Sequence, residues 1–106
     1  MRYPFGIHIW WRNIFRKQRH WRGWPYAFTV QPGLSIEIEV GASEDSVLGG
    51  YHTVPLSNIH LPIAAGTTSV LTYTNQGGSP SFWRIREQSG LINYLRINDD
   101  VIFDYR

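Results

Sequence analysis

Paired carboxylates are the residues of this chain whose types and spacing come closest to those of a catalytic site. Three pairs lie one or two positions apart in the sequence: Glu37/Glu39, Glu44/Asp45 and Asp99/Asp100. In an extended strand the side chains of Glu37 and Glu39 point to the same side, about 7 Å apart. A glycosidase instead places its two carboxyl groups on opposite sides of the sugar. The spacing therefore favours a solvated acidic face over a catalytic pair.

Other catalytic and metal-binding patterns are missing from the sequence. The chain has no cysteine, no glycine-rich phosphate loop and no serine in a Gly-x-Ser-x-Gly elbow. Its histidines lack the close spacing of zinc ligands; they are His8, His20, His52 and His60. We therefore expect no enzymatic activity, no cofactor and no metal site.

Positive charge and tryptophan are concentrated in the first 24 residues. This segment contains six basic residues, no acidic residue and four of the five tryptophans. Residues 25–106 carry four arginines and eight acidic residues, so the two parts have net charges of opposite sign. Such a division is typical of a basic segment that meets an anionic partner, or the acidic part of another copy.

The aromatic and basic side chains of this segment allow four interpretations. They belong to the protein core, they anchor a protein interface, they lie on a membrane surface, or they bind nucleic acid. In the interface interpretation the aromatic anchors are Trp10, Trp11, Phe15, Trp21 and Trp24. The basic side chains would pair with carboxylates of a neighbouring copy, such as Glu37 and Glu39; they are Arg12, Arg16, Lys17, Arg19 and Arg22.

From Tyr26 onward, short β-rich runs alternate with turn residues. Residues 34–40 give the clearest signal, because apolar and polar residues alternate as in a strand with one buried and one solvated face. Residues 26–31 and 67–75 are predicted as further strands, and residues 43–50 as a loop. Two prolines limit residues 51–66 to edge strands or an extended loop.

The last quarter of the chain contains three β-rich runs, at 81–87, 91–97 and 101–106. The connections between them have the length and composition of hairpin turns, so we predict an antiparallel meander. Its residues resemble the paired strands of concanavalin-like and laminin-G-like β-sandwiches, through Phe82, Arg84, Ile85, Gly90, Ile92, Tyr94, Asn98, Val101 and Phe103. The resemblance implies a jelly-roll-like sandwich that binds glycans or protein surfaces, a type frequent in receptor-binding parts of phage tails.

Together these runs predict an all-β fold of six to eight strands, either a compact antiparallel β-sandwich (jelly-roll-like) or a small barrel. Residues 26–106 would form this domain, and residues 1–25 a basic segment. Residues 7–22 fit both helical and strand spacing, so we expect a strand to about Trp11 and then helical turns or a loop. Besides some N-terminal tryptophans, the expected core contains Leu34, Ile36, Ile38, Val40, Val70, Leu71, Ile85, Ile92, Val101 and Phe103.

These features predict a non-enzymatic assembly or binding module whose partners are other protein subunits, including copies of itself. The first hypothesis is a structural subunit of a larger particle, such as a viral or phage capsid-decoration or tail protein. The second is a lectin-like module with aromatic rings that stack on sugars, for which the candidates are Tyr51, Tyr73, Trp83 and Tyr94. The third is binding of nucleic acid or a membrane surface by the basic segment.

Overall fold

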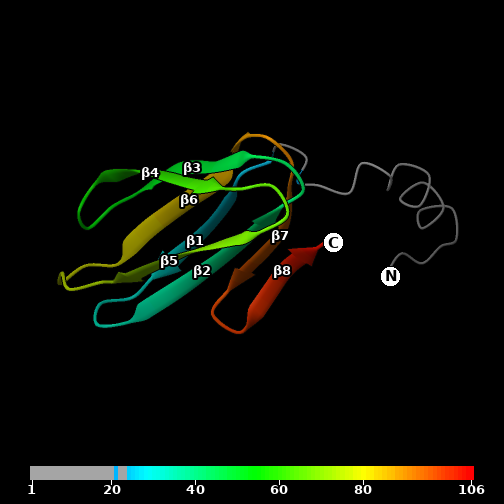
Figure 1. Ribbon diagram of the computed structural model, residues 1–106. Helices are drawn as coiled ribbons and strands as arrows, with labels where there is room; N and C mark the ends of the chain where they lie inside the picture. Colours follow the sequence, from blue (N-terminus) through cyan, green and yellow to red (C-terminus); the bar gives the residue numbers. More distant parts are fainter. Residues whose placement is uncertain (1–20, 22–23) are drawn as a thin grey trace, which may run out of the picture.

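The computed structural model describes residue 21 and residues 24–106 of the chain, and within them the predicted all-β sandwich is confirmed. These residues form eight antiparallel strands in two four-stranded sheets and no helix (Figure 1). The strands are β1 (Tyr26–Val30), β2 (Ser35–Ala42), β3 (Ser46–His52), β4 (Ser57–Ile63), β5 (Thr68–Thr74), β6 (Ser81–Ser89), β7 (Ile92–Ile97) and β8 (Asp100–Asp104).

The chain changes sheet at most of its connections. One sheet, here sheet A, has the strand order β1-β6-β3-β4, and the other, sheet B, has the order β5-β2-β7-β8. Among the strand pairs that follow one another in the sequence, β3 and β4 pair within sheet A and β7 and β8 pair within sheet B. The predicted meander is therefore correct for β7 and β8 but wrong for β6, because β6 belongs to the opposite sheet.

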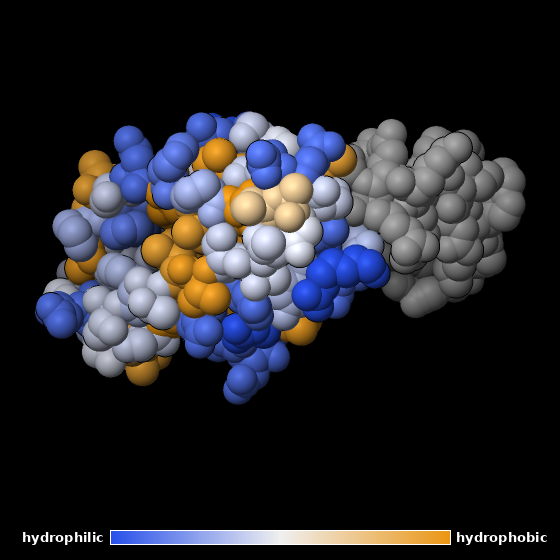
Figure 2. All heavy atoms as spheres, viewed as in Figure 1, coloured by the Kyte–Doolittle hydropathy of each residue, from blue (hydrophilic) through white to orange (hydrophobic). Residues whose placement is uncertain are grey.

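The core lies between the inner faces of the two sheets. Alternate residues of β2 point inward, as the sequence predicts, and Ile38 and Val40 are fully buried there. Ile85 of β6 and Ile92 of β7 contribute buried side chains from the two sheets. Figure 2 shows apolar surface near β5 in the middle of that view, on the outside of this core.

Three residues expected in the core are exposed instead. Leu34 is 55% exposed because it lies in the turn before β2. Val70 is 48% exposed because it alternates with Leu71, the residue of that pair packed against the core. Val101 is 54% exposed; it pairs with Arg96 at an irregularity between β7 and β8. Adjacent residues of one strand face opposite sides, so Val70 and Leu71 cannot both point inward.

β3 occupies residues that the sequence predicted as a loop, and this prediction is wrong. Glycines are disfavoured in strands, and β3 contains Gly49 and Gly50. At Gly50 φ is 130°, and an added Cβ would lie 2.0 Å from the carbonyl oxygen of Arg84. The close approach of β3 to β6 therefore requires glycine at this position.

Trp21 belongs to the core of the sandwich. It is 0% exposed, and its backbone N–H donates to the carbonyl oxygen of Ile92 over 2.6 Å. Its ring meets those of Trp24 and Phe103 edge to face, at centroid distances of 5.3 and 5.4 Å. Part of the segment assigned to residues 1–25 is thus integrated into the sandwich. Within the part of the chain that the structure describes, no helix is long and apolar enough to cross a membrane.

Candidate functional site

The outer face of sheet B carries charged side chains that form ion pairs with one another. Glu37 and Glu39 point to the same side of β2, as predicted, and Arg96 of β7 reaches both. The guanidinium Nη2 lies 3.3 Å from Glu37 Oε2, and Nε lies 3.1 Å from Glu39 Oε1. The hydrogen bond from Arg96 lowers the pKa of Glu39, against a smaller opposing effect of desolvation. Both carboxylates therefore share one cation of their own chain.

A second ion pair lies beside the first on the same face. Arg106 donates through Nε and Nη2 to the two carboxylate oxygens of Asp104, each over 3.0 Å. These bonds lower the pKa of Asp104. The Arg106 guanidinium also lies over the ring of Tyr94, 3.8 Å from its centroid, a cation–π arrangement. The hydroxyl of Tyr94 lies 3.4 Å from Glu39 Oε1, which joins the two ion pairs.

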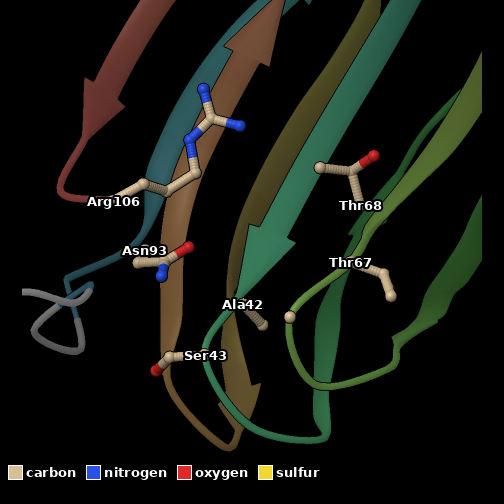
Figure 3. Close-up of a pocket in the computed structure, with 7 residues that line it drawn as sticks. Ala42, Ser43, Thr67, Thr68, Asn93 and Arg106 are labelled. Carbon is tan, nitrogen blue, oxygen red and sulfur yellow. The ribbon is translucent and has the colours of Figure 1, made fainter.

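A pocket of about 630 Å³ opens next to Arg106. Between Gly41 and Ala42 the pairing of β2 with β7 shifts by one residue, so Asn93 is the extra residue of a β-bulge. The Oδ1 atom of Asn93 is buried and has no hydrogen-bond partner. Figure 3 shows Asn93 and Arg106 on one side of the pocket, opposite the 67–68 segment. The lining consists of Ala42, Ser43, Gly66, Thr67, Thr68, Asn93 and Arg106.

The outer face of sheet A has a different character. Five exposed residues of its strands form what we call the basic-aromatic face: Tyr51, His60, Phe82, Arg84 and Arg86. Arg84 lies directly across from Tyr51, and Gly49 lies between Arg86 and His60. Phe82 is 56% exposed and Tyr51 44% exposed, so two aromatic rings reach the surface of this face. A hollow of about 270 Å³ beside them is lined in part by Arg84.

The arginines of the basic-aromatic face lack carboxylate partners. Among the described residues, Arg84 and Arg86 form no ion pair, in contrast to Arg96 and Arg106 of sheet B. The acidic residue of β6, Glu87, accepts a hydrogen bond from the backbone N–H of Ile92 and is only partly exposed. The basic-aromatic face therefore presents uncompensated positive charge next to apolar rings.

The turn between β7 and β8 presents the opposite charge. Asp99, Asp100 and the exposed Val101 form what we call the acidic tip. Asn98 holds this turn against β2: its N–H donates to Glu37 O over 2.9 Å, and its Oδ1 accepts from Glu37 N–H over 3.0 Å. Asn98 has φ of 53°, which suits asparagine in a tight turn. Two carboxylates are thus displayed on a backbone that is firmly held.

The predicted interface residues fall mostly outside the described residues. Eight of them are not among the described residues, so their roles stay predictions; they are Trp10, Trp11, Phe15, Arg12, Arg16, Lys17, Arg19 and Arg22. Of the two anchors that are described, Trp21 is buried in the core of its own chain, and Trp24 is 42% exposed beside it.

Only one of the four rings predicted to stack on sugars is exposed. Tyr51 is exposed, whereas Trp83 and Tyr94 are buried, at 2% and 6% exposure. Trp83 lies between the rings of Phe28 and His52, with the His52 centroid 4.5 Å away. Tyr73 is partly buried, and its hydroxyl donates to the carbonyl oxygen of Val54. We therefore withdraw Trp83 and Tyr94 as ligand-stacking candidates.

The sequence analysis assigned no role to Arg86 or Asn93. It named Phe82 and Arg84 only for the family resemblance and did not predict that they share a surface patch. The alternation in residues 81–87 carried a signal for three of them, because Phe82, Arg84 and Arg86 fall on one side of a strand. Asn93 could not be found in this way, since its position depends on the bulge opposite β2.

Within the described residues, no group of three or more His, Cys, Asp or Glu side chains is placed to hold a metal ion. Comparisons with protein-family models, curated proteins and solved structures gave no match for this chain. The resemblance to concanavalin-like and laminin-G-like sandwiches therefore stays a prediction, and function must be argued from the surfaces described above.

Proposed function

We propose that this protein is a non-enzymatic assembly module, a structural subunit that associates with other protein subunits, including copies of itself. The observation that carries the proposal is the separation of charge along the chain. Residues 1–24 hold six basic and no acidic residues, and residues 25–106 hold four arginines against eight acidic residues. Contact between copies brings the opposite charges together and fixes how the subunits orient.

The ion pairs of sheet B support a revision of which carboxylates take part. Arg96 already bridges Glu37 and Glu39, so a basic side chain from a neighbour would have to compete with Arg96 for them. Among the described residues, Glu44, Asp99 and Asp100 have no ion pair. We therefore assign intermolecular pairing to the adjacent carboxylates of the acidic tip, Asp99 and Asp100, rather than to Glu37 and Glu39.

Sedimentation velocity of the full chain tests this proposal. We expect species larger than a monomer whose population rises with protein concentration. These species should dissociate as salt is raised from about 0.05 M to about 0.5 M, because added ions screen exposed charges. A monomer at every concentration and at every salt level would remove the support for self-association.

A second candidate function is carbohydrate binding at the basic-aromatic face. The observation that favours it is the exposed ring of Tyr51 beside the hollow lined by Phe82 and Arg84, since aromatic rings stack on sugar faces. Titration of the isotopically labelled protein with a set of glycans would move amide signals of β3 and β6. The substitution Tyr51→Ala should abolish those shifts, and shifts confined to other strands would exclude this face.

A further inference from the structure

The described part of the chain displays two uncompensated surfaces of opposite charge, each with an apolar component. The basic-aromatic face combines Arg84 and Arg86 with the exposed ring of Phe82. The acidic tip combines Asp99 and Asp100 with Val101, which is 54% exposed. We propose that the acidic tip of one copy docks on the basic-aromatic face of another, an inference that rests on the proposed self-assembly and names its contact.

The spacing of the two arginines allows one acidic turn to contact both of them. Arg84 and Arg86 are two residues apart on β6, so their Cα atoms are separated by about 7 Å along the strand. Both guanidinium groups can therefore be reached by one turn that carries two consecutive carboxylates. Val101 would lie against the ring of Phe82, so the contact removes apolar area from water as well as pairing charges.

One copy cannot make this contact with itself. The acidic tip comprises the end of the β7–β8 turn and the first two residues of β8 in sheet B, whereas the basic-aromatic face lies on the outside of sheet A. In Figure 1, β3 and β4 of sheet A lie at the top of the sandwich, and the β7–β8 turn lies at the bottom. Because the two surfaces lie on opposite sides of the sandwich, two copies cannot exchange both contacts at once. The contact is therefore heterologous, and repeating it produces a ring or an open chain of subunits.

The acidic tip is also prepared for docking. Two hydrogen bonds between Asn98 and Glu37 fix the turn, and Arg96 donates to the carbonyl oxygen of Asn98. A segment that is already ordered loses little conformational entropy when it binds. By contrast, Asp45 of the other acidic loop already accepts a hydrogen bond from the backbone N–H of Ala65 over 2.9 Å. These differences favour the acidic tip as the occupant of the face.

Reciprocal charge reversal tests the contact in the full chain. The first variant is Arg84→Glu/Arg86→Glu, and the second is Asp99→Lys/Asp100→Lys; all four positions are exposed, so both should fold. Each variant alone should self-associate at least about tenfold more weakly than the native protein, because like charges then face one another. An equimolar mixture should recover association, since the acidic tip of the first variant meets the unchanged basic face of the second.

Controls separate this inference from the proposed function. Circular dichroism checks the fold of each variant, and the milder pair Asp99→Asn/Asp100→Asn keeps the chemistry of the turn while removing its charge. Glu44→Lys, a reversal at a different loop, should leave association within about twofold of the native protein. A native protein that stays monomeric would contradict self-assembly itself.

Association that survives both reversals, or a mixture that does not recover, would overturn the docking inference while leaving self-assembly in place. Loss of association in the Arg84→Glu/Arg86→Glu variant but not in the Asp99→Lys/Asp100→Lys variant would also overturn it. In that case the face would receive an acidic surface other than the tip.

Discussion

Replacing Trp21 with alanine is expected to destabilise the sandwich by about 3–5 kcal/mol, the usual cost of removing a fully buried large aromatic side chain. Trp21 is 0% exposed. A buried aromatic side chain removes roughly 150–250 Å² from water, which at about 25 cal/mol per Å² corresponds to about 4–6 kcal/mol. The alanine side chain in the variant would keep only a small part of this buried area. A domain of this size has a total stability of about 5–15 kcal/mol, so the variant should lie near the limit of folding.

Trp24→Ala is the matched control, because Trp24 lies beside Trp21 but is 42% exposed. Its partial burial predicts a smaller loss, about 1–2 kcal/mol. Urea denaturation followed by far-ultraviolet circular dichroism measures both variants, with the slope m expected to stay unchanged. Equal losses for the two variants, or a loss below about 1 kcal/mol for Trp21→Ala, would refute the placement of Trp21 in the core.

Two further predictions concern the acid dependence of stability and the backbone of β3. Arg96 lowers the pKa of Glu39 in the folded state, so this pair stabilises the protein above the ordinary pKa of glutamate and loses that effect as pH falls through the folded value. Urea midpoints measured between about pH 3 and 7 should therefore depend less steeply on acid in Arg96→Met. Gly50→Ala should cost more than about 2 kcal/mol, because its Cβ would clash with the carbonyl of Arg84. Gly33→Ala measures the cost of the backbone conformation alone, because φ there is 85° and an added Cβ would meet no atom within 4 Å. An equal loss of stability in both variants would show that the predicted clash at Gly50 does not occur.

The fold class could be predicted because alternation is a local property. Residues 34–40 display it cleanly, and the buried residues Ile36, Ile38 and Val40 of β2 follow directly from it. β3 was missed because two adjacent glycines lower β-propensity, while the reason for them lies in another strand: the backbone of β6 passes close to Gly50. The residues that require glycine at position 50 lie 34 or 35 positions away along the chain, so a short stretch of sequence around Gly50 carries no sign of them.

The assignment of β6 and β7 failed for a related reason. A short connection with a glycine suits both a hairpin and a crossing between sheets, and propensity does not distinguish them. At Gly90, where φ is 86°, an added Cβ would lie 2.5 Å from the carbonyl oxygen of Asp45. The backbone N–H of Leu91 donates to Ser46 Oγ over 2.8 Å. These contacts with Asp45 and Ser46, at the start of β3, accompany the passage of the chain from sheet A to sheet B.

The charges along the sequence show which part of the chain is acidic, but they do not show which carboxylates lack an ion-pair partner in the fold. Alternation placed Glu37 and Glu39 on one side of a strand, and this made them the obvious partners for a basic segment. Their actual partner, Arg96, lies 57 residues from Glu39 in sequence and reaches it only because β2 and β7 pair.

An ion pair formed within a sheet is already neutralised before any second copy approaches, so it contributes little to long-range attraction between copies. The charges that can direct assembly are those that the fold leaves without partners. For the described residues they include Arg84 and Arg86 on the outside of sheet A, and Asp99 and Asp100 of the acidic tip, so this part of the chain by itself presents surfaces of opposite charge.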